Sequence, residues 1–306
     1  MALDWTNFAD EKNYRRVSFQ MKARDTGQKK NDVVKGELLL QKSPFDHKAL
    51  IVLIPGMGEN VSTKGSAEVL ANAGFDVVRF RSGISIFEKR LLENKTNLSP
   101  EEFRAFVARG SKIIRNRACD YVMMIRYLDN RFGYEYVGVS GVSLGGIFAA
   151  LIAAEEQKIQ DVLMMISGGN IAEVLRTSTE RPIAEIRDLV EKKFTGSNED
   201  LWKILKEELA IAEPLARADS LCGKRVRIIA NHWDSVIRPR YSREFRSASC
   251  ADDYEVILFP PGHYGSGLLL WIPMLRLELF NGFLPYPRSF DTVSDINLRF
   301  FQKTLH

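Results

Sequence analysis

A run of six consecutive apolar residues, Ala-Leu-Ile-Val-Leu-Ile at positions 49–54, lies between Lys48 and the breakers Pro55 and Gly56. Such a short run is typical of a strand that is buried on both faces of a parallel sheet. Further β-forming runs then alternate with helical patterns along the chain. This alternation predicts an α/β fold, with a mostly parallel, doubly wound sheet that is flanked by helices and carries helical cap insertions.

The chain has 306 residues, of which 45% are hydrophobic and 27% charged, enough for a sizeable buried core. We expect a single domain over residues 1–306. The expected strands cover residues 17–21, 33–40, 49–54, 75–80, 134–139, 162–166, 226–230 and 254–259. The expected helices cover residues 62–73, 112–128 and 143–155.

Two long stretches, residues 82–110 and 170–222, interrupt the alternation. The second contains two amphipathic stripes, one running from Ile183 to Val190 and one from Leu201 to Leu209. Because loops of this length between sheet elements are usually functional, we interpret both stretches as cap or lid insertions. They would cover a pocket at the carboxyl ends of the strands, where α/β sheets bind ligands. Insertions that serve packing alone are the alternative.

Charge and cysteine content narrow the classes of partner and the compartment. The formal net charge of +4 is spread along the chain and is too small to indicate nucleic acid or an anionic membrane as partner. Cys119, Cys222 and Cys250 are odd in number and far apart. They predict reduced, buried thiols in a cytoplasmic protein, not a disulfide framework or a zinc site.

Two segments bear on membrane targeting. The first residues contain no apolar run that could act as a signal peptide. The apolar stretch at residues 267–284 is interrupted by Pro273, Arg276, Glu278 and Asn281, and it is shorter than the ~20 residues that a span needs. We therefore expect a buried helix there, with no membrane span.

The segment Gly-Val-Ser-Leu-Gly at residues 141–145 matches G-x-S-x-G and lies between an expected strand and an alanine-rich helix. Such a sharp turn strains the serine backbone, and side chains at Gly141 and Gly145 would collide with the neighbouring strand and helix. The turn presents the hydroxyl of Ser143 at a helix N-terminus, which favours developing negative charge. A glycine-rich phosphate loop is the structural competitor, but neither nucleotide-binding glycine pattern is present. Ser143 is therefore the candidate nucleophile.

A serine nucleophile needs a general base, and the chain has four histidines. His263 lies in the glycine-rich loop Pro-Pro-Gly-His-Tyr-Gly-Ser-Gly, directly after the last expected strand and at the same sheet edge as Ser143. It is our candidate base. His232 follows the preceding strand and is the alternative, whereas His47 lies in a polar loop and His306 is the terminal residue.

The base needs an orienting carboxylate. Asp234 comes just after the expected strand 226–230, again at that edge, and is the candidate acid. An aspartate in such a loop could equally serve only as a turn or helix-cap residue. Glu173, which follows the strand 162–166, is the second candidate for the acid.

An oxyanion needs backbone N–H donors. Leu144 follows the nucleophile and can supply one. The second should come from the loop after the first buried strand, where Gly56 and Gly58 permit close approach and Met57 is the best candidate. An ordinary glycine turn is the alternative for this loop.

Four separated segments together resemble the α/β-hydrolase-fold family: the Pro-Gly-Met-Gly loop, the Gly-Val-Ser-Leu-Gly-Gly elbow, the Asn-His-Trp-Asp loop and the Pro-Gly-His-Tyr loop. They cover roughly residues 49–280. The resemblance implies that Ser143 is the nucleophile, Asp234 the acid and His263 the base, in the chain order of that family. Pro55 stands where many members have histidine, and the segment after Phe80 is longer than in typical members.

These residues lead us to expect a carboxylesterase-like serine hydrolase that cleaves a small-molecule ester or thioester through an acyl-enzyme. No metal ion or organic cofactor is expected. An acyltransferase or a peptidase with the same triad remains an alternative. A non-catalytic binding module on a hydrolase scaffold is a further one, because fold alone does not imply function.

Overall fold

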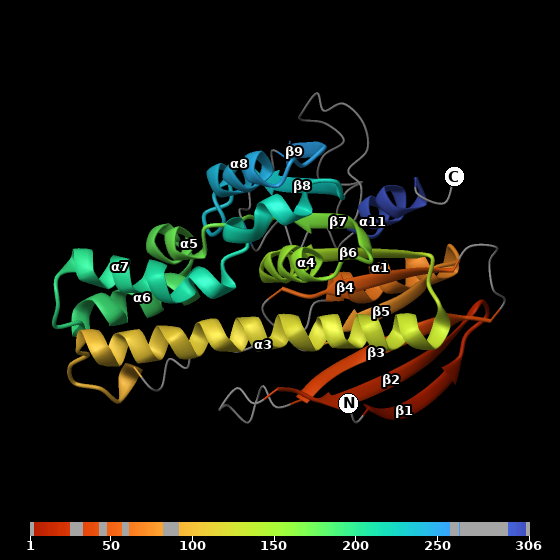
Figure 1. Ribbon diagram of the computed structural model, residues 1–306, viewed down its shortest axis with the longest axis horizontal. Coiled ribbons are helices and arrows are strands. Elements are labelled where there is room, and N and C mark those ends of the chain that lie inside the picture. Colours follow the sequence, from red (N-terminus) through yellow and green to blue (C-terminus); the bar gives the residue numbers. More distant parts are fainter. Residues whose placement is uncertain are drawn as a thin grey trace, which may run out of the picture.

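The computed structural model describes residues 3–24, 33–42, 48–56, 61–81, 92–257, 263 and 293–303. Within these ranges the strands form one nine-stranded sheet in the order β1-β2-β3-β5-β4-β6-β7-β8-β9 (Figure 1). The strands are β1 Leu3–Asp10, β2 Tyr14–Lys22, β3 Val33–Gln41, β4 Ala49–Ile54, β5 Asp76–Phe80, β6 Tyr136–Val142, β7 Ile159–Met165, β8 Arg225–Asn231 and β9 Asp253–Ile257. The α-helices are α1 Val61–Asn72, α3 Pro100–Phe132, α4 Leu144–Glu155, α5 Ile171–Thr177, α6 Arg181–Lys193, α7 Asn198–Leu209, α8 Pro239–Ala248 and α11 Val293–Gln302. The short 3₁₀ helices η2 Ala210–Ala212 and η3 Leu215–Leu221 follow α7.

The six strands from β5 to β9 pair in parallel, and β1, β2, β3 and β5 pair antiparallel. The predicted mostly parallel α/β sheet is therefore confirmed. Strand β1 was not predicted; it pairs with β2 alone and leaves Phe8 68% exposed. Apolar and polar residues alternate only from Leu3 to Thr6, before the irregularity between Thr6 and Phe8, which is a short signal for a strand.

The central strand β4 is buried along its whole length. Leu50, Val52 and Ile54 belong to the core that α3 and α4 cover, and the residues between them belong to a second core, beneath α1 and α11. Because successive side chains of a strand point to opposite faces, a strand with helices on both sides must be apolar throughout. This arrangement explains the run of six apolar residues.

Helix α3 begins at Pro100, twelve residues before the helix expected from residue 112. Ser99 caps it: the Ser99 hydroxyl accepts the N–H of Glu102, and the Glu102 carboxylate accepts the N–H of Ser99. This capping box was present in the sequence and was missed, so the helix begins earlier than predicted. The first turns of α3 extend past the sheet and pack against α7 (Figure 1). Residues 82–91 of the predicted 82–110 insertion lie outside the described residues.

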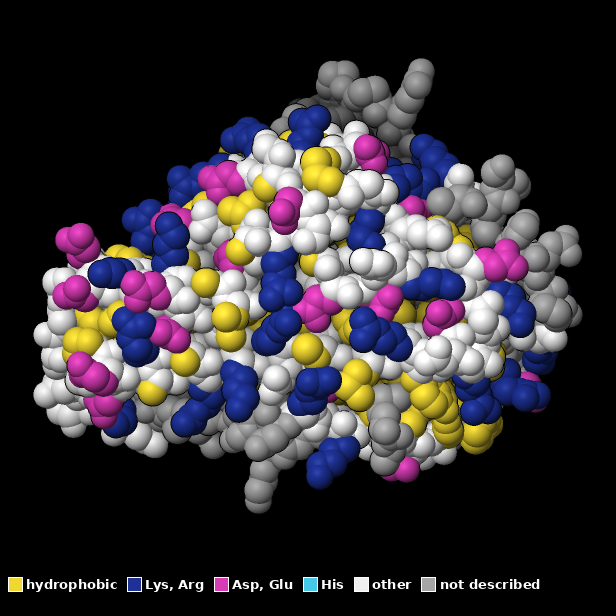
Figure 2. All heavy atoms as spheres, viewed as in Figure 1, with side chains coloured by type: hydrophobic (Ala, Val, Ile, Leu, Met, Phe, Trp, Pro, Cys, Tyr) yellow, Lys and Arg dark blue, Asp and Glu magenta, His cyan; other side chains and the backbone are white. Residues whose placement is uncertain are grey.

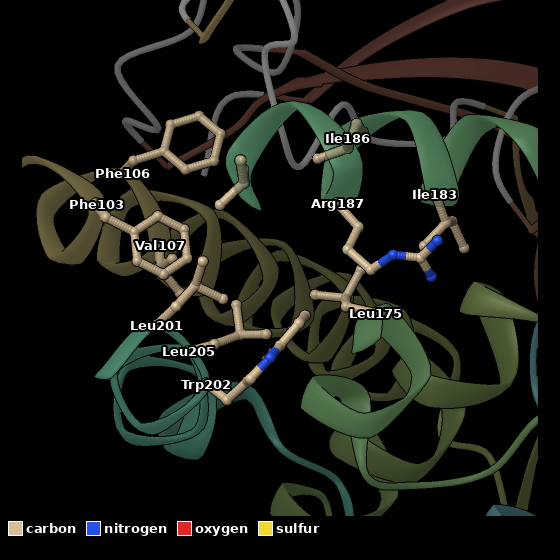
Figure 3. Close-up of a pocket in the computed structure, with 11 residues that line it drawn as sticks. Phe103, Phe106, Val107, Leu175, Ile183, Ile186, Arg187, Leu201, Trp202 and Leu205 are labelled. Atoms are coloured by element: carbon tan, nitrogen blue, oxygen red, sulfur yellow. The ribbon is translucent and has the colours of Figure 1, made fainter. Parts of the chain in front are cut away.

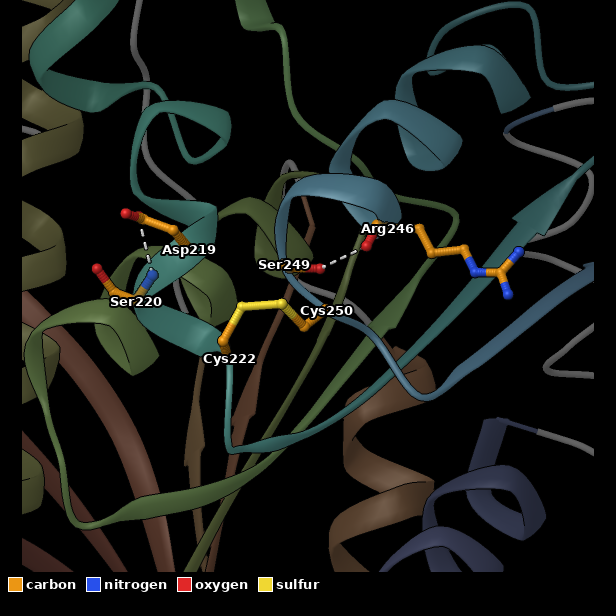
Figure 4. Close-up of a disulfide and its surroundings, with 6 residues drawn as sticks. All are labelled: Asp219, Ser220, Cys222, Arg246, Ser249 and Cys250. Atoms are coloured by element: carbon orange, nitrogen blue, oxygen red, sulfur yellow. Dashed lines mark hydrogen bonds between the residues drawn. A yellow bond between two sulfur atoms is a disulfide. The ribbon is translucent and has the colours of Figure 1, made fainter.

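Cys222 and Cys250 form a disulfide (Figure 4), so the prediction of three reduced thiols is wrong for this pair. Cys119 is free. Cys222 precedes β8 and Cys250 precedes β9, and these two strands are parallel neighbours. Residues 28 apart in sequence are thereby brought to a Cα–Cα distance of 5.1 Å, which spacing alone could not reveal. Disulfides persist mainly in oxidising compartments, and the cytoplasmic location stays a prediction.

Lys and Arg side chains are interspersed with Asp and Glu on the face of the molecule in Figure 2. None of the helices that the structure describes combines the length and the apolar character that crossing a bilayer requires. The apolar stretch 267–284, for which a buried helix was predicted, lies outside the described residues.

Candidate active site

Ser143 sits at the reversal between β6 and α4. Its backbone has φ 55° and ψ −122°, and its N–H donates to the carbonyl of Met165 on β7 at 2.9 Å. A positive φ is unfavourable for a residue with a side chain, and such strain clusters at functional sites. The strained turn predicted for this serine is therefore present.

The glycines around Ser143 leave no room for a side chain. A Cβ on Gly141 would lie 2.0 Å from the carbonyl oxygen of Gly145. A Cβ on Gly145 would lie 2.3 Å from the carbonyl oxygen of Ile54, on the neighbouring strand β4. A third glycine, Gly146, packs in the same way on the side chain of Ser167. The absence of side chains at Gly141 and Gly145, the two glycines of the motif, therefore lets α4 start directly against β4 and β6.

Ser143, His263 and Asp234 form one hydrogen-bonded chain. The Oγ of Ser143 lies 2.7 Å from Nε2 of His263, and Nδ1 of His263 lies 2.8 Å from Oδ2 of Asp234. His263 is only 5% exposed and Asp234 only 4%. The tertiary structure thus brings together three side chains that are 120 and 29 residues apart in sequence. This arrangement can remove a proton from the hydroxyl and hold the resulting imidazolium.

Asp234 is held by its own loop. Its Oδ1 accepts the backbone N–H groups of Val236 and Ile237, each at 2.8 Å, which leaves Oδ2 directed at His263. A turn aspartate and a catalytic aspartate were predicted as alternatives at this position, but the side chain makes both sets of contacts. The two N–H donors were missed, although an aspartate that accepts N–H groups two and three residues ahead is a recognisable turn signal.

The second candidates are placed elsewhere. Glu173 pairs with Arg176 on the same helix, with a shortest distance of 2.6 Å. His232 is exposed, and its ring meets the Trp233 ring edge-on at 5.1 Å between centroids. His47 and His306 lie outside the described residues.

The expected oxyanion donors are only partly described. Leu144 is the first residue of α4, where the N–H groups have no partner within the helix. Gly56 lies against the elbow: a Cβ on it would be 3.6 Å from the Cβ of Ser143. Met57 and Gly58 lie outside the described residues, so the donor role of Met57 stays a prediction.

The segment that begins the 170–222 region is bonded to the Asp234 loop. The carbonyl of Ser235 accepts the N–H of Thr179 at 3.2 Å, and the hydroxyl of Ser235 donates to the carboxylate of Glu180. Arg238 also donates to the carbonyl of Thr177 at 3.0 Å. The acid loop and the start of this region therefore hold each other in place.

Glu213 joins the two ends of the same region. Its carboxylate accepts the N–H groups of Asn170 and Ile171, both at 2.6 Å, and that of Leu215 at 3.1 Å. Burial raises the pKa of Glu213 and outweighs these hydrogen bonds, and the nearby carboxylate of Glu244 adds to the rise.

Within the described ranges, no group of three or more His, Cys, Asp or Glu residues is arranged to hold a metal ion.

No model of a known protein family matches the sequence, and no curated protein matches it. Solved structures do resemble the fold. Acetyl xylan esterase 1 from Thermoanaerobacterium sp. is 15% identical with a TM-score of 0.63, over 87% of this chain and 86% of that one. Acetyl xylan esterase from Paenibacillus sp. is 12% identical with a TM-score of 0.60, over 85% and 83%. Acylaminoacyl peptidase from Pyrococcus horikoshii is 16% identical with a TM-score of 0.53, over 96% of this chain and 41% of that one.

The sheet order, the strained serine turn and these structural neighbours all indicate the same fold. Sequence identities this low support a shared fold but do not establish a shared reaction. The chain has the α/β-hydrolase fold.

Proposed function

We propose that this protein is a serine hydrolase that cleaves a carboxylic ester or thioester through an acyl-enzyme. The observation that carries the proposal is the pair of hydrogen bonds that joins Ser143 to His263 and His263 to Asp234, at 2.7 and 2.8 Å. Both distances fall within the roughly 2.6–3.2 Å over which a nucleophile and its base can transfer a proton.

In the proposed reaction, Nε2 of His263 takes the proton of the Ser143 hydroxyl as Oγ attacks the carbonyl carbon. The negative charge on the carbonyl oxygen is held by the N–H groups of Leu144 and Met57. His263 then gives its proton to the leaving alcohol or thiol, and the acyl group stays on Ser143. Water, deprotonated by His263, releases the acid and restores the hydroxyl.

Asp234 serves this cycle without losing its charge. It keeps the proton of the neutral imidazole on Nδ1, which leaves Nε2 free to accept from Ser143. The loop N–H groups of Val236 and Ile237 hold its carboxylate in that orientation. The buried position of Asp234 strengthens the interaction with the imidazolium because solvent screens it little.

We further propose that residues 1–306 act as one domain and that the 170–222 region works as a cap over the site. The bonds between residues 177–180 and the Asp234 loop support this, as does the position of α5, α6 and α7 beside the ends of the strands (Figure 1).

A peptidase with the same triad is the second candidate function, because one structural neighbour is an acylaminoacyl peptidase.

A fluorophosphonate probe tests the proposal. We expect it to label the wild type and the surface control Ser247→Ala, and to leave Ser143→Ala unlabelled. Ester turnover should fall by about 10⁶ in Ser143→Ala or His263→Ala. Equal turnover of a working ester by Ser143→Ala and the wild type would overturn the mechanism. No labelling of the folded wild type, with ester and amide panels also inactive, would favour a non-catalytic binding module.

A further inference from the structure

The turn that carries Asp234 is bonded to a second segment through Ser235. The hydroxyl of Ser235 donates to the carboxylate of Glu180, and its carbonyl accepts the N–H of Thr179 at 3.2 Å. Ser235 stands between Asp234 and Val236, whose N–H is one of the two that hold the Asp234 carboxylate. Glu180 therefore contacts the residue that directly follows the proposed catalytic acid.

The carboxylate of Glu180 is used for this contact and not for an ion pair. Among the residues that the structure describes, no Lys, Arg or His side chain pairs with it, and its partner is the Ser235 hydroxyl. Glu173, in contrast, pairs with Arg176 on its own helix. Because a hydrogen bond to an ionised carboxylate is stronger than one between neutral groups, Glu180 can restrain Ser235 effectively.

Glu180 is itself fixed from its own side. Its N–H donates to the hydroxyl of Ser178 at 3.3 Å. Arg187 on α6 donates to the carbonyl of Ser178 at 2.6 Å, so the segment before Glu180 is bonded to the helix after it. In Figure 3 the Arg187 guanidinium extends along α6 toward Ile183, in the first turn of that helix. A side chain that orients another group must have such support of its own.

An apolar contact joins the same two segments. Ile183 packs against a small core that contains Val236 and Ile237, the two residues whose N–H groups hold Asp234. Ile183 also lines a small, mostly apolar pocket between the first turns of α3 and helices α5, α6 and α7 (Figure 3). The start of α6 therefore connects the loop of Asp234 to the packed helices of the 170–222 region.

We propose that Glu180 is a positioning residue for the triad: through the Ser235 hydroxyl it keeps the turn of Asp234 where the carboxylate meets His263. The assignment rests on the proposed function. Glu180 acts through Ser235 and is not itself a catalytic group. A displacement of about 1 Å of a group on which the chemistry depends can lower a rate by about a hundredfold. The 170–222 region would thereby contribute to the rate as well as cover the site.

The first test compares two substitutions of Glu180. Glu180→Ala removes the acceptor of the Ser235 hydroxyl, so kcat for p-nitrophenyl acetate should fall about ten- to hundredfold while KM stays within about twofold. Glu180→Gln keeps an oxygen that can accept from Ser235, and its kcat should stay within about threefold of the wild type. Glu191→Ala, at an exposed position of the same helix, is the matched control and should change neither constant. A kcat of Glu180→Ala equal to that of the wild type would overturn the assignment, as would an equal loss in Glu180→Gln.

A double-variant cycle tests whether Glu180 acts through Ser235. Ser235→Ala should lower kcat as Glu180→Ala does. The double variant Glu180→Ala/Ser235→Ala should lower it no further, because the two side chains form a single bond. Losses that add in the double variant would overturn the route through Ser235.

The fluorophosphonate probe separates positioning from a loss of folded protein. Glu180→Ala should be labelled at Ser143 to the same final extent as the wild type, but about ten- to hundredfold more slowly. A lower final extent at an unchanged rate would show a smaller folded fraction and overturn the assignment. Labelling at the same rate and extent would overturn the role of Glu180 and leave the hydrolase standing. A wild type that is neither labelled nor active on any ester would overturn the hydrolase, and with it this assignment.

Discussion

Asp234 and His263 lie 2.8 Å apart, Oδ2 to Nδ1, and both side chains are buried. The other oxygen of Asp234 is occupied by two loop N–H groups, so the carboxylate cannot turn away without leaving those donors unpaired. An unpaired buried N–H costs about 1–3 kcal/mol. The orientation of His263 is thus set by the backbone of the loop that follows β8.

This relationship predicts the effect of Asp234→Asn. The amide oxygen can still accept from Val236 and Ile237, so we expect the free energy of unfolding to change by less than about 1 kcal/mol. The amide N–H would face Nδ1 of His263 and favour the tautomer with its proton on Nε2, which cannot accept from Ser143. We expect kcat for p-nitrophenyl acetate to fall by about 10⁴. Urea unfolding curves of both proteins check the free energy of unfolding. A kcat within tenfold of the wild type would contradict this role.

A second prediction concerns the elbow glycines. In Gly145→Ala the new Cβ would meet the carbonyl oxygens of Ile54 and Pro55 at 2.3 and 2.6 Å. Both are backbone atoms, which cannot move aside as a flexible side chain could. We expect a loss of about 3 kcal/mol or more in the free energy of unfolding, measured in urea.

Gly65→Ala is the matched control for the elbow variant. Gly65 lies inside α1, and the nearest atom to its Cβ would be Oγ of Ser294 at 3.4 Å. Alanine should there stabilise the protein by up to about 1 kcal/mol, because glycine is a poor helix former. Equal stability of Gly145→Ala and Gly65→Ala would show that the elbow tolerates a side chain.

A third prediction concerns the bridge between Cys222 and Cys250. A link between residues 28 apart restricts the unfolded chain, so the double variant to serine should lose about 3–4 kcal/mol in free energy of unfolding. The bridge joins the segments before β8 and β9, whereas Asp234 follows the other end of β8. We therefore expect the triad to keep its activity below the unfolding temperature. Cys119→Ser is the control, and an unfolding temperature that reduction leaves unchanged would argue against the bridge.

A fourth prediction concerns the buried carboxyl of Asp120 on α3. Burial raises its pKa from 3.8 to about 6, although the N–H of Arg24 and the guanidinium of Arg117 act against that rise. The folded state therefore binds more protons than the unfolded state between these values, and its stability falls as pH increases through this window. A shift of this size corresponds to about 3 kcal/mol.

Asp120→Asn removes this dependence. Relative to the wild type, the variant should gain up to about 3 kcal/mol between pH 4 and pH 7, measured by urea unfolding at both values. Asp252→Asn, at an exposed position, should follow the wild type. A gain in Asp120→Asn that is the same at both pH values would contradict the prediction.

The core strands and the serine turn could be predicted because their signals are local. The apolar run of β4 and the strand-to-helix change around Ser143 each occupy a few consecutive residues, and the structure reproduces both. The capping box at Ser99 was also local and was overlooked. Edge strand β1 alternates over only four residues, before the irregularity between Thr6 and Phe8, so its local signal is short.

That Ser143, Asp234 and His263 should meet could be predicted from sequence, because each follows a predicted strand and parallel strands end at one sheet edge. The orientation of Asp234 and the pairing of Cys222 with Cys250 became visible only in the folded chain. These features depend on distances between segments far apart in the chain. Hydrophobic periodicity fixes which face of an element is buried, but it carries no information on which residues of two packed elements come into contact.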